Sequence, residues 1–130
     1  MTPTILYIED HPDNMTLVKR IIHASNYTLI EAGTGLQGLW IAENQKVELV
    51  LLDINLPDID GYEIARRLRN SSKPWLAKIP IIAVTANAMR GDDRKVLAAG
   101  CNAYISKPFD IQELLEKITD FMSFPLQEQS

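Results

Sequence analysis

Cysteine and histidine are scarce in this sequence, which contains a single cysteine, Cys101, and two histidines, His11 and His23. One cysteine excludes a disulfide within the chain and a metal site built from several thiolates, and it fits a reducing compartment such as the cytoplasm. His11 and His23 do not have the spacing of a metal site or of a catalytic triad. We therefore expect a cytoplasmic protein in which Cys101 is a small buried thiol and His23 lies on a helix surface.

Long apolar runs and an excess of basic charge are also absent. No apolar run approaches the roughly 20 residues that a membrane-spanning helix needs. The first four residues, Met-Thr-Pro-Thr, have neither the basic segment nor the long apolar segment of a signal peptide. Since 13 Lys and Arg face 17 Asp and Glu, the net charge of -4 provides no global basic field, and we expect no direct contact with nucleic acid or a membrane.

Five short runs of apolar and β-branched residues along the 130-residue chain predict five strands. They span residues 4–8, 27–32, 49–52, 81–84 and 103–106. The segments between them have helical spacing and predict five helices: residues 12–25, a segment with Leu36, Leu39 and Trp40, a segment with Ile64, Ala65 and Leu68, a segment from Asp92 or Asp93 to Gly100, and a last helix capped by Asp110. Strands that alternate with helices predict a parallel sheet with helices on both faces.

Several expectations about single side chains follow from the same spacing. Trp40 is expected in the core. The third helix carries three arginines that we expect on a solvated face rather than in a nucleic-acid patch, Arg66, Arg67 and Arg69. The last helix is expected to present one apolar stripe, made of Ile111, Leu114, Leu115, Ile118, Phe121 and Met122. Residues 70–80 are expected to form a loop.

Polar residues follow four of the predicted strands. Glu9 and Asp10 follow the first, Asp53 the third, Thr85 the fourth and Lys107 the fifth. Because parallel strands end at one edge of a sheet, we expect these side chains to meet there, where open α/β sheets bind their ligands. Carboxylates placed together repel one another unless a cation joins them, and oxygen ligands suit a hard ion such as Mg²⁺. A lysine and a hydroxyl beside them suit a phosphoryl group, which an aspartate can accept as a nucleophile.

Four segments, taken in order, are similar to the motifs of one known family. They are Tyr7-Ile8-Glu9-Asp10, Leu51-Leu52-Asp53-Ile54-Asn55-Leu56-Pro57 with Asp60-Gly61, Val84-Thr85-Ala86-Asn87-Ala88, and Tyr104-Ile105-Ser106-Lys107-Pro108-Phe109. Each is a weak signal alone, but together they span nearly the whole chain, and the sequence resembles the receiver domain of response regulators in two-component signalling. The resemblance implies a flavodoxin-like, doubly wound parallel sheet of five strands in the order 2-1-3-4-5 with five helices.

The resemblance also implies a role for the acidic residues. Asp53 is implied as the phosphoacceptor, which takes a phosphoryl group from a phosphohistidine on a partner protein. Mg²⁺, for which Mn²⁺ can substitute, is implied to be held by Asp53, by Glu9 and Asp10, and by the backbone carbonyl of Asn55. The side chain of Asn55 is then free to vary.

The implied switch involves Thr85, Lys107 and Tyr104. Lys107 pairs with the phosphoryl oxygens, Thr85 moves to hydrogen-bond them, and Tyr104 turns inward as Thr85 moves. The Lys107–Pro108 peptide bond is implied to be cis, in the one context where cis costs little. The predicted fourth helix, fifth strand and fifth helix then change the surface that they present to a partner.

The family implies a phosphorylation-dependent signalling switch rather than an enzyme that turns over external substrates. The implied phosphodonor is a sensor histidine kinase or a histidine phosphotransfer protein, and the output is an unidentified downstream protein. A monomer or a weak phosphorylation-dependent dimer is expected. We expect residues 1–123 to form the receiver domain and residues 124–130 a short polar tail without an output domain, which favours a stand-alone regulator over a piece of a larger regulator or hybrid kinase.

Three alternatives are open at the level of sequence. A haloacid-dehalogenase-type phosphatase also uses a strand-end aspartate and Mg²⁺, but it normally carries a second aspartate where this chain has Asn55. A flavodoxin-like FMN binder needs a phosphate loop after the first strand, where this chain instead places the acids Glu9 and Asp10. A degenerate receiver that acts only as a binding module is disfavoured because all five site residues are present. Phosphate-ester turnover would favour the first alternative, and bound flavin the second.

Overall fold

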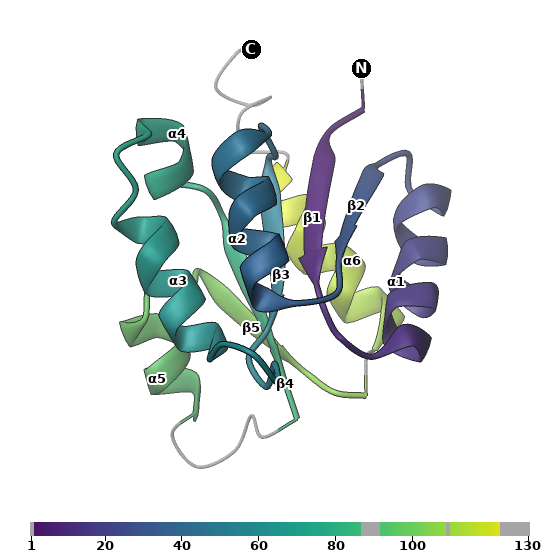
Figure 1. Cartoon of the computed structure of the whole chain (residues 1–130). Helices are drawn as coiled ribbons and strands as arrows, with labels where there is room; N and C mark the ends of the chain where they lie inside the picture. Colours follow the sequence, from purple (N-terminus) through teal and green to yellow (C-terminus); the bar gives the residue numbers. More distant parts are fainter. Residues whose placement is uncertain (1, 87–91, 109, 123–130) are drawn as a thin grey trace.

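The computed structural model describes residues 2–86, 92–108 and 110–122, and within these residues five strands form one parallel sheet. The strand order is β2-β1-β3-β4-β5, which confirms the predicted doubly wound topology. The strands are β1 Thr4–Ile8, β2 Thr28–Ala32, β3 Leu49–Asp53, β4 Ile81–Thr85 and β5 Ala103–Ser106. Their carboxyl ends lie at the lower end of the sheet in Figure 1.

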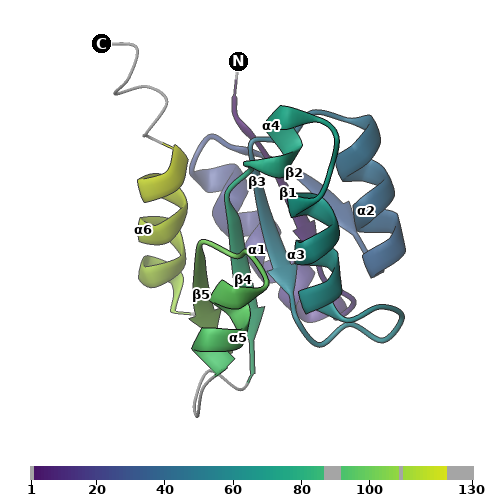
Figure 2. The same ribbon diagram turned by 90° about the vertical axis from the view of Figure 1, so that its left-hand side faces the viewer.

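Helices cover both faces of the sheet, so that β1, β3 and β4 are buried between two layers (Figures 1 and 2). One face is covered by α1 Pro12–Ala24 and α6 Ile111–Met122. The other is covered by α2 Gly35–Asn44, α3 Gly61–Arg69, α4 Pro74–Ala77 and α5 Asp92–Ala98. The sequence predicted five helices; the structure adds α4, a single turn that begins at Pro74 inside the predicted 70–80 loop.

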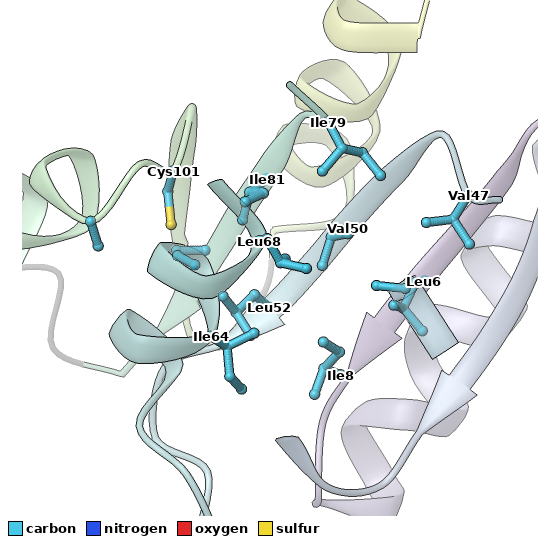
Figure 3. Close-up of a cluster of buried hydrophobic side chains, with 14 of the residues drawn as sticks. Leu6, Ile8, Val47, Val50, Leu52, Ile64, Leu68, Ile79, Ile81 and Cys101 are labelled. Carbon is cyan, nitrogen blue, oxygen red and sulfur yellow. The ribbon is translucent and has the colours of Figure 1, made fainter. Parts of the chain in front are cut away.

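Alternation along the strands divides the core between the two faces. In β1, Leu6 and Ile8 point to the α2–α5 side, whereas Ile5 and Tyr7 point to the α1 and α6 side. Figure 3 shows the first of these clusters, in which side chains of α3 lie against those of β3 and β4. Cys101 is buried at the edge of this cluster, as predicted. Among the described residues, no helix combines the length and hydropathy needed to cross a bilayer.

Trp40 was predicted to lie in the core, and that prediction is wrong, because its side chain is 66% exposed. Helix α2 instead packs on the sheet through Gly35, Gly38, Ile41 and Ala42. A Cβ atom on Gly38 would lie 2.4 Å from Cδ1 of Ile8, so the helix approaches β1 more closely there than any larger residue allows. That close approach fixes the rotation of α2 and turns Trp40 toward solvent.

The apolar stripe predicted for the last helix is only partly correct. Leu114 and Ile118 are buried, and Leu115, Phe121 and Met122 are half-buried against the same cluster. Ile111, in contrast, is 50% exposed at the first position of α6. Asp110 caps this helix as predicted, because its carboxylate accepts hydrogen bonds from the backbone N–H groups of Gln112 and Glu113.

Arg69 was predicted to lie on a solvated face with Arg66 and Arg67, and it is the exception among the three. Its guanidinium donates to the carbonyl oxygens of Gly100 at 2.8 Å, Ala77 at 3.2 Å and Ile79 at 2.7 Å, and to Oδ1 of Asn102 at 2.7 Å. Arg69 is the last residue of α3, so its side chain reaches the connections that lead into β4 and β5. Arg66 and Arg67 are exposed and pair with Glu63.

Candidate functional site

The register of the sheet brings the predicted site residues together at the carboxyl ends of the strands. Ile8 is paired with Leu52, and Asp53 with Val84, so Glu9 and Asp53 extend side by side from β1 and β3. Lys107 is placed next to β4 because its backbone N–H donates to the carbonyl oxygen of Thr85 at 2.9 Å. The expectation that these residues share one edge of the sheet follows directly from the parallel pairing.

Three carboxylates form the centre of the site. Glu9, Asp10 and Asp53 each offer an oxygen, and these oxygens lie within 4.8 Å of one another. Glu9 is 2% exposed and Asp53 is 1% exposed, whereas Asp10 is exposed to solvent. The cluster is therefore open to solvent at Asp10 and enclosed by protein at Glu9 and Asp53. Its hard oxygen donors fit a small divalent cation such as Mg²⁺.

Lys107 supplies a positive charge to two of the carboxylates. Its Nζ atom lies 3.0 Å from Oε1 of Glu9 and 3.4 Å from Oδ2 of Asp53. One ammonium thus faces two buried acids, which leaves the cluster with more negative than positive charge when all three acids are ionised. Such a cluster can gain stability by binding a proton or a further cation.

The pKa values of the two buried acids move in opposite directions. Burial, reinforced by a hydrogen bond with Glu9, raises the pKa of Asp53 from its ordinary value of 3.8 to about 6. Burial alone would raise the pKa of Glu9 as well, but hydrogen bonds with Asp53, Tyr7 and Lys107 outweigh it and lower that pKa. Lys107 is nearer to Glu9 than to Asp53, which agrees with Glu9 being the stronger acid of the pair.

Tyr7 is a component of the site that the sequence analysis missed. Its hydroxyl group donates a hydrogen bond of 2.8 Å to Oε1 of Glu9, and its side chain is fully buried. Burial, followed by the nearby charge of Glu9, raises the pKa of Tyr7, so the phenol remains a donor at neutral pH. A signal was present, because residues two apart on a strand point to the same face.

The remaining predicted residues occupy different positions around the cluster. Thr85 is 1% exposed at the end of β4, next to the strand that carries Asp53. The backbone N–H of Asn55 donates to Oδ1 of Asp53 at 3.0 Å, and the Asn55 side chain is exposed. Tyr104 is half-buried against the α2–α5 cluster. The Lys107–Pro108 bond is cis, as the resemblance implied.

The loop that follows Asp53 is anchored at two points, Asp58 and Gly61. The carboxylate of Asp58 accepts hydrogen bonds of 2.9 Å from the backbone N–H groups of Gly35 and Leu36, at the beginning of α2. Where the loop meets α3, Gly61 lies so close to the end of β3 that an added Cβ would be 2.6 Å from Cα of Ile54 and 2.8 Å from the carbonyl oxygen of Asp53. These contacts hold the loop, and with it the Asn55 backbone, in one position relative to Asp53.

Comparison with solved structures identifies the fold and one relevant ligand. The receiver domain of the sensor histidine kinase PA1611 from Pseudomonas aeruginosa PAO1 is 34% identical to this chain, with a TM-score of 0.86, and the match covers 95% of this chain and 99% of that one. That structure has a magnesium ion coordinated in its active site cleft. A CheY-like receiver domain protein from Methanospirillum hungatei is 30% identical with a TM-score of 0.88, over 98% of this chain and 99% of that one.

Comparison of sequences leads to the same family. The polar-differentiation response regulator DivK of Brucella ovis is 38% identical over 122 residues, which cover 94% of this chain and 98% of the relative. DivK of Brucella anthropi is also 38% identical over the same length. The family model of the response regulator receiver domain matches residues 5–119, so it includes the whole acidic cluster and Lys107. The chain therefore belongs to the response regulator receiver domain family of two-component signalling.

Proposed function

We propose that this receiver domain accepts a phosphoryl group on Asp53 from a phosphohistidine of a sensor histidine kinase or a histidine phosphotransfer protein. The observation that carries the proposal is the cluster of Glu9, Asp10 and Asp53, whose oxygens lie within 4.8 Å of one another, with Nζ of Lys107 3.4 Å from Asp53. Asp53 is the acid that lies at the end of the central strand β3, between Glu9 and Thr85. It is therefore the carboxylate that all the other groups surround.

In the proposed reaction, a carboxylate oxygen of Asp53 attacks the phosphorus atom and the P–N bond to the donor imidazole breaks, its electron pair leaving on the nitrogen. Asp53 has to be ionised for this step, a condition that most molecules meet above its raised pKa of about 6. Glu9, Asp10, Asp53 and the backbone carbonyl of Asn55 would hold Mg²⁺ (or Mn²⁺), which when bound neutralises charge on the phosphoryl oxygens. Lys107 turns from the carboxylate pair toward those oxygens.

The proposed output is a change of surface on α5, β5 and α6. The phosphoryl group adds about -1.5 to -2 units of charge beside Thr85, whose hydroxyl group would move to donate to it. Tyr104, on β5, would turn inward as Thr85 moves. Leu97 of α5 and Ile111 of α6 are 52% and 50% exposed, so this surface offers apolar side chains that a downstream protein could cover.

The receiver domain would comprise residues 1–123, with residues 124–130 as a tail that lies outside the described residues. The protein would act in the cytoplasm as a monomer or a weak phosphorylation-dependent dimer, without direct contact with nucleic acid or a membrane. It would assist its own phosphorylation and dephosphorylation but would not turn over external substrates.

The test is incubation with acetyl phosphate and Mg²⁺, followed by intact-protein mass spectrometry. One added phosphoryl group is expected on the unmodified sequence and none on Asp53→Asn. Asp13→Asn, which changes an exposed acid in the first turn of α1, is the matched control and should be phosphorylated normally. A phosphoryl adduct that persists in Asp53→Asn would refute the assignment, and steady turnover of a simple phosphate ester would favour a phosphatase instead.

A further inference from the structure

The Tyr7 hydroxyl group is buried in an apolar layer, where a hydroxyl group needs a compensating hydrogen bond. The ring belongs to the cluster between the sheet and helices α1 and α6, where its neighbours include Ile5, Leu51 and Val18. Its hydroxyl group is directed out of this layer toward the acidic cluster and donates to Oε1 of Glu9 at 2.8 Å. The compensating partner is thus a residue of the functional site.

The two oxygens of Glu9 have different surroundings. Oε1 accepts from the Tyr7 hydroxyl, lies 3.0 Å from Nζ of Lys107 and is 3.4 Å from Nδ2 of Asn14. Oε2 accepts a longer hydrogen bond, 3.3 Å, from the backbone N–H of His11. The donors on Oε1 therefore fix the rotation of the carboxylate and leave Oε2 as the oxygen that is more available to a cation.

We infer that Tyr7 is a positioning residue for the metal site, and this inference rests on the proposed role of Glu9 as a metal ligand. The phenol holds Oε1 of Glu9 in place, so that the carboxylate keeps one orientation and Oε2 has only the longer contact with His11. It also gives Oε1 a neutral donor, so that Glu9 keeps a partner when Lys107 turns toward a phosphoryl group. Groups that orient a metal ligand commonly change metal affinity by roughly 10- to 100-fold when they are removed.

The experiment is a titration of the apo protein with Mg²⁺ by isothermal calorimetry, which requires no phosphorylation. Tyr7→Phe keeps the ring and removes only the donor, and we expect Mg²⁺ to bind about tenfold more weakly. Tyr27→Phe is the control, because Tyr27 packs half-buried against the same cluster at the other end of the sheet, just before β2. It should bind Mg²⁺ as the unmodified protein does.

A second variant, Glu9→Asp, distinguishes a positioning role of Tyr7 from a general loss of structure. Glu9→Asp retains a carboxylate but is one methylene shorter, which places it beyond hydrogen-bonding distance of the Tyr7 phenol. Tyr7→Phe should therefore change Mg²⁺ affinity less than twofold when it is combined with Glu9→Asp. The role of Tyr7 is overturned if Tyr7→Phe lowers Mg²⁺ affinity tenfold both with Glu9 and with Glu9→Asp, or if it does not lower the affinity when Glu9 is present. Neither result would contradict the proposed function. If the unmodified protein binds no Mg²⁺, the metal site of the proposed function fails as well.

Discussion

The two ends of the sheet both bury charged groups, and they do so in opposite ways. At the amino ends of β4 and β5, the single guanidinium of Arg69 donates to four neutral oxygens, from Gly100, Ala77, Ile79 and Asn102. At the carboxyl ends, Lys107 is shared by the two buried carboxylates of Glu9 and Asp53. In the first cluster the fold provides acceptors for four of the five guanidinium N–H groups, whereas the second cluster has an excess of negative charge.

The difference separates a structural cluster from a reactive one. Burial lowers the pKa of Arg69, but a guanidinium stays protonated under all ordinary conditions, so this cluster has one state. The acidic cluster has several states, because the raised pKa of Asp53 allows a proton to be exchanged for a cation near neutral pH. Four substitutions test this contrast.

Arg69→Ala should cause the largest loss of stability, about 2–4 kcal/mol in the free energy of unfolding, because three carbonyl groups lose their donor and the two connections that lead into β4 and β5 lose their link to α3. Urea denaturation followed by circular dichroism measures this loss. Arg66→Ala, an exposed arginine one turn earlier, is the control and should be nearly neutral. A similar small effect for both variants would show that Arg69 is not a structural anchor.

Asp53→Asn should have the opposite sign and stabilise the apo protein at pH 7.5 by about 2–3 kcal/mol, the free energy that corresponds to the raised pKa. Since the folded-state pKa of about 6 exceeds the ordinary value of 3.8, ionised Asp53 destabilises the fold. The stability advantage of the variant should therefore be small below pH 4, increase as pH rises from 4 to 6, and persist above. Urea denaturation of both proteins in EDTA across this range measures it.

Saturating Mg²⁺ provides the control for Asp53→Asn. A bound cation should remove the destabilisation that ionised Asp53 causes in the unmodified protein, so the difference in unfolding free energy between the two proteins should become smaller. A variant that is less stable than the unmodified protein at neutral pH would show that the charge of Asp53 is already compensated.

Lys107→Gln should destabilise the apo protein at neutral pH by about 1–2 kcal/mol, because it removes the cation shared by two buried acids. Mg²⁺ should recover part of this loss by neutralising the same carboxylates. Thermal unfolding with and without Mg²⁺ provides the measurement. Lys19→Gln, which removes an exposed pair with Glu31, should show neither the loss nor the recovery. Equal sensitivity of both variants to Mg²⁺ would contradict the expectation.

Asp58→Asn should have the smallest effect, about 0.5–1 kcal/mol, because the amide retains one acceptor but loses the charge that favours the amino end of α2. The more specific readout is amide hydrogen exchange. We expect faster exchange at Gly35 and Leu36, whose N–H groups donate to Asp58, and no change at Gln37, which is capped by Thr34. Unchanged exchange at all three positions would rule out the anchoring of the loop by Asp58.

The sheet and the acidic cluster could be predicted because their signals are local. Each apolar run ends at the residue that carries the chemistry, and parallel pairing brings those ends together whatever the surrounding loops do. Arg69 could not be separated from Arg66 and Arg67, since its acceptors at residues 77, 79, 100 and 102 are distant in sequence. The Trp40 prediction was wrong for a related reason: α2 carries apolar residues on several sides, and the side that is buried is the one where Gly35 and Gly38 allow close packing against residues distant in sequence.

The Arg69 cluster also has a mechanical consequence. It fixes the bases of β4 and β5 to α3, while the tips of the same strands carry Thr85 and Lys107. The amino ends of these two strands are therefore held by Arg69, and their carboxyl ends are held by strand pairing. Displacement caused by a new charge beside Asp53 would then be largest at the carboxyl ends of β4 and β5 and in the segments attached to them, and smallest at the amino ends that Arg69 holds.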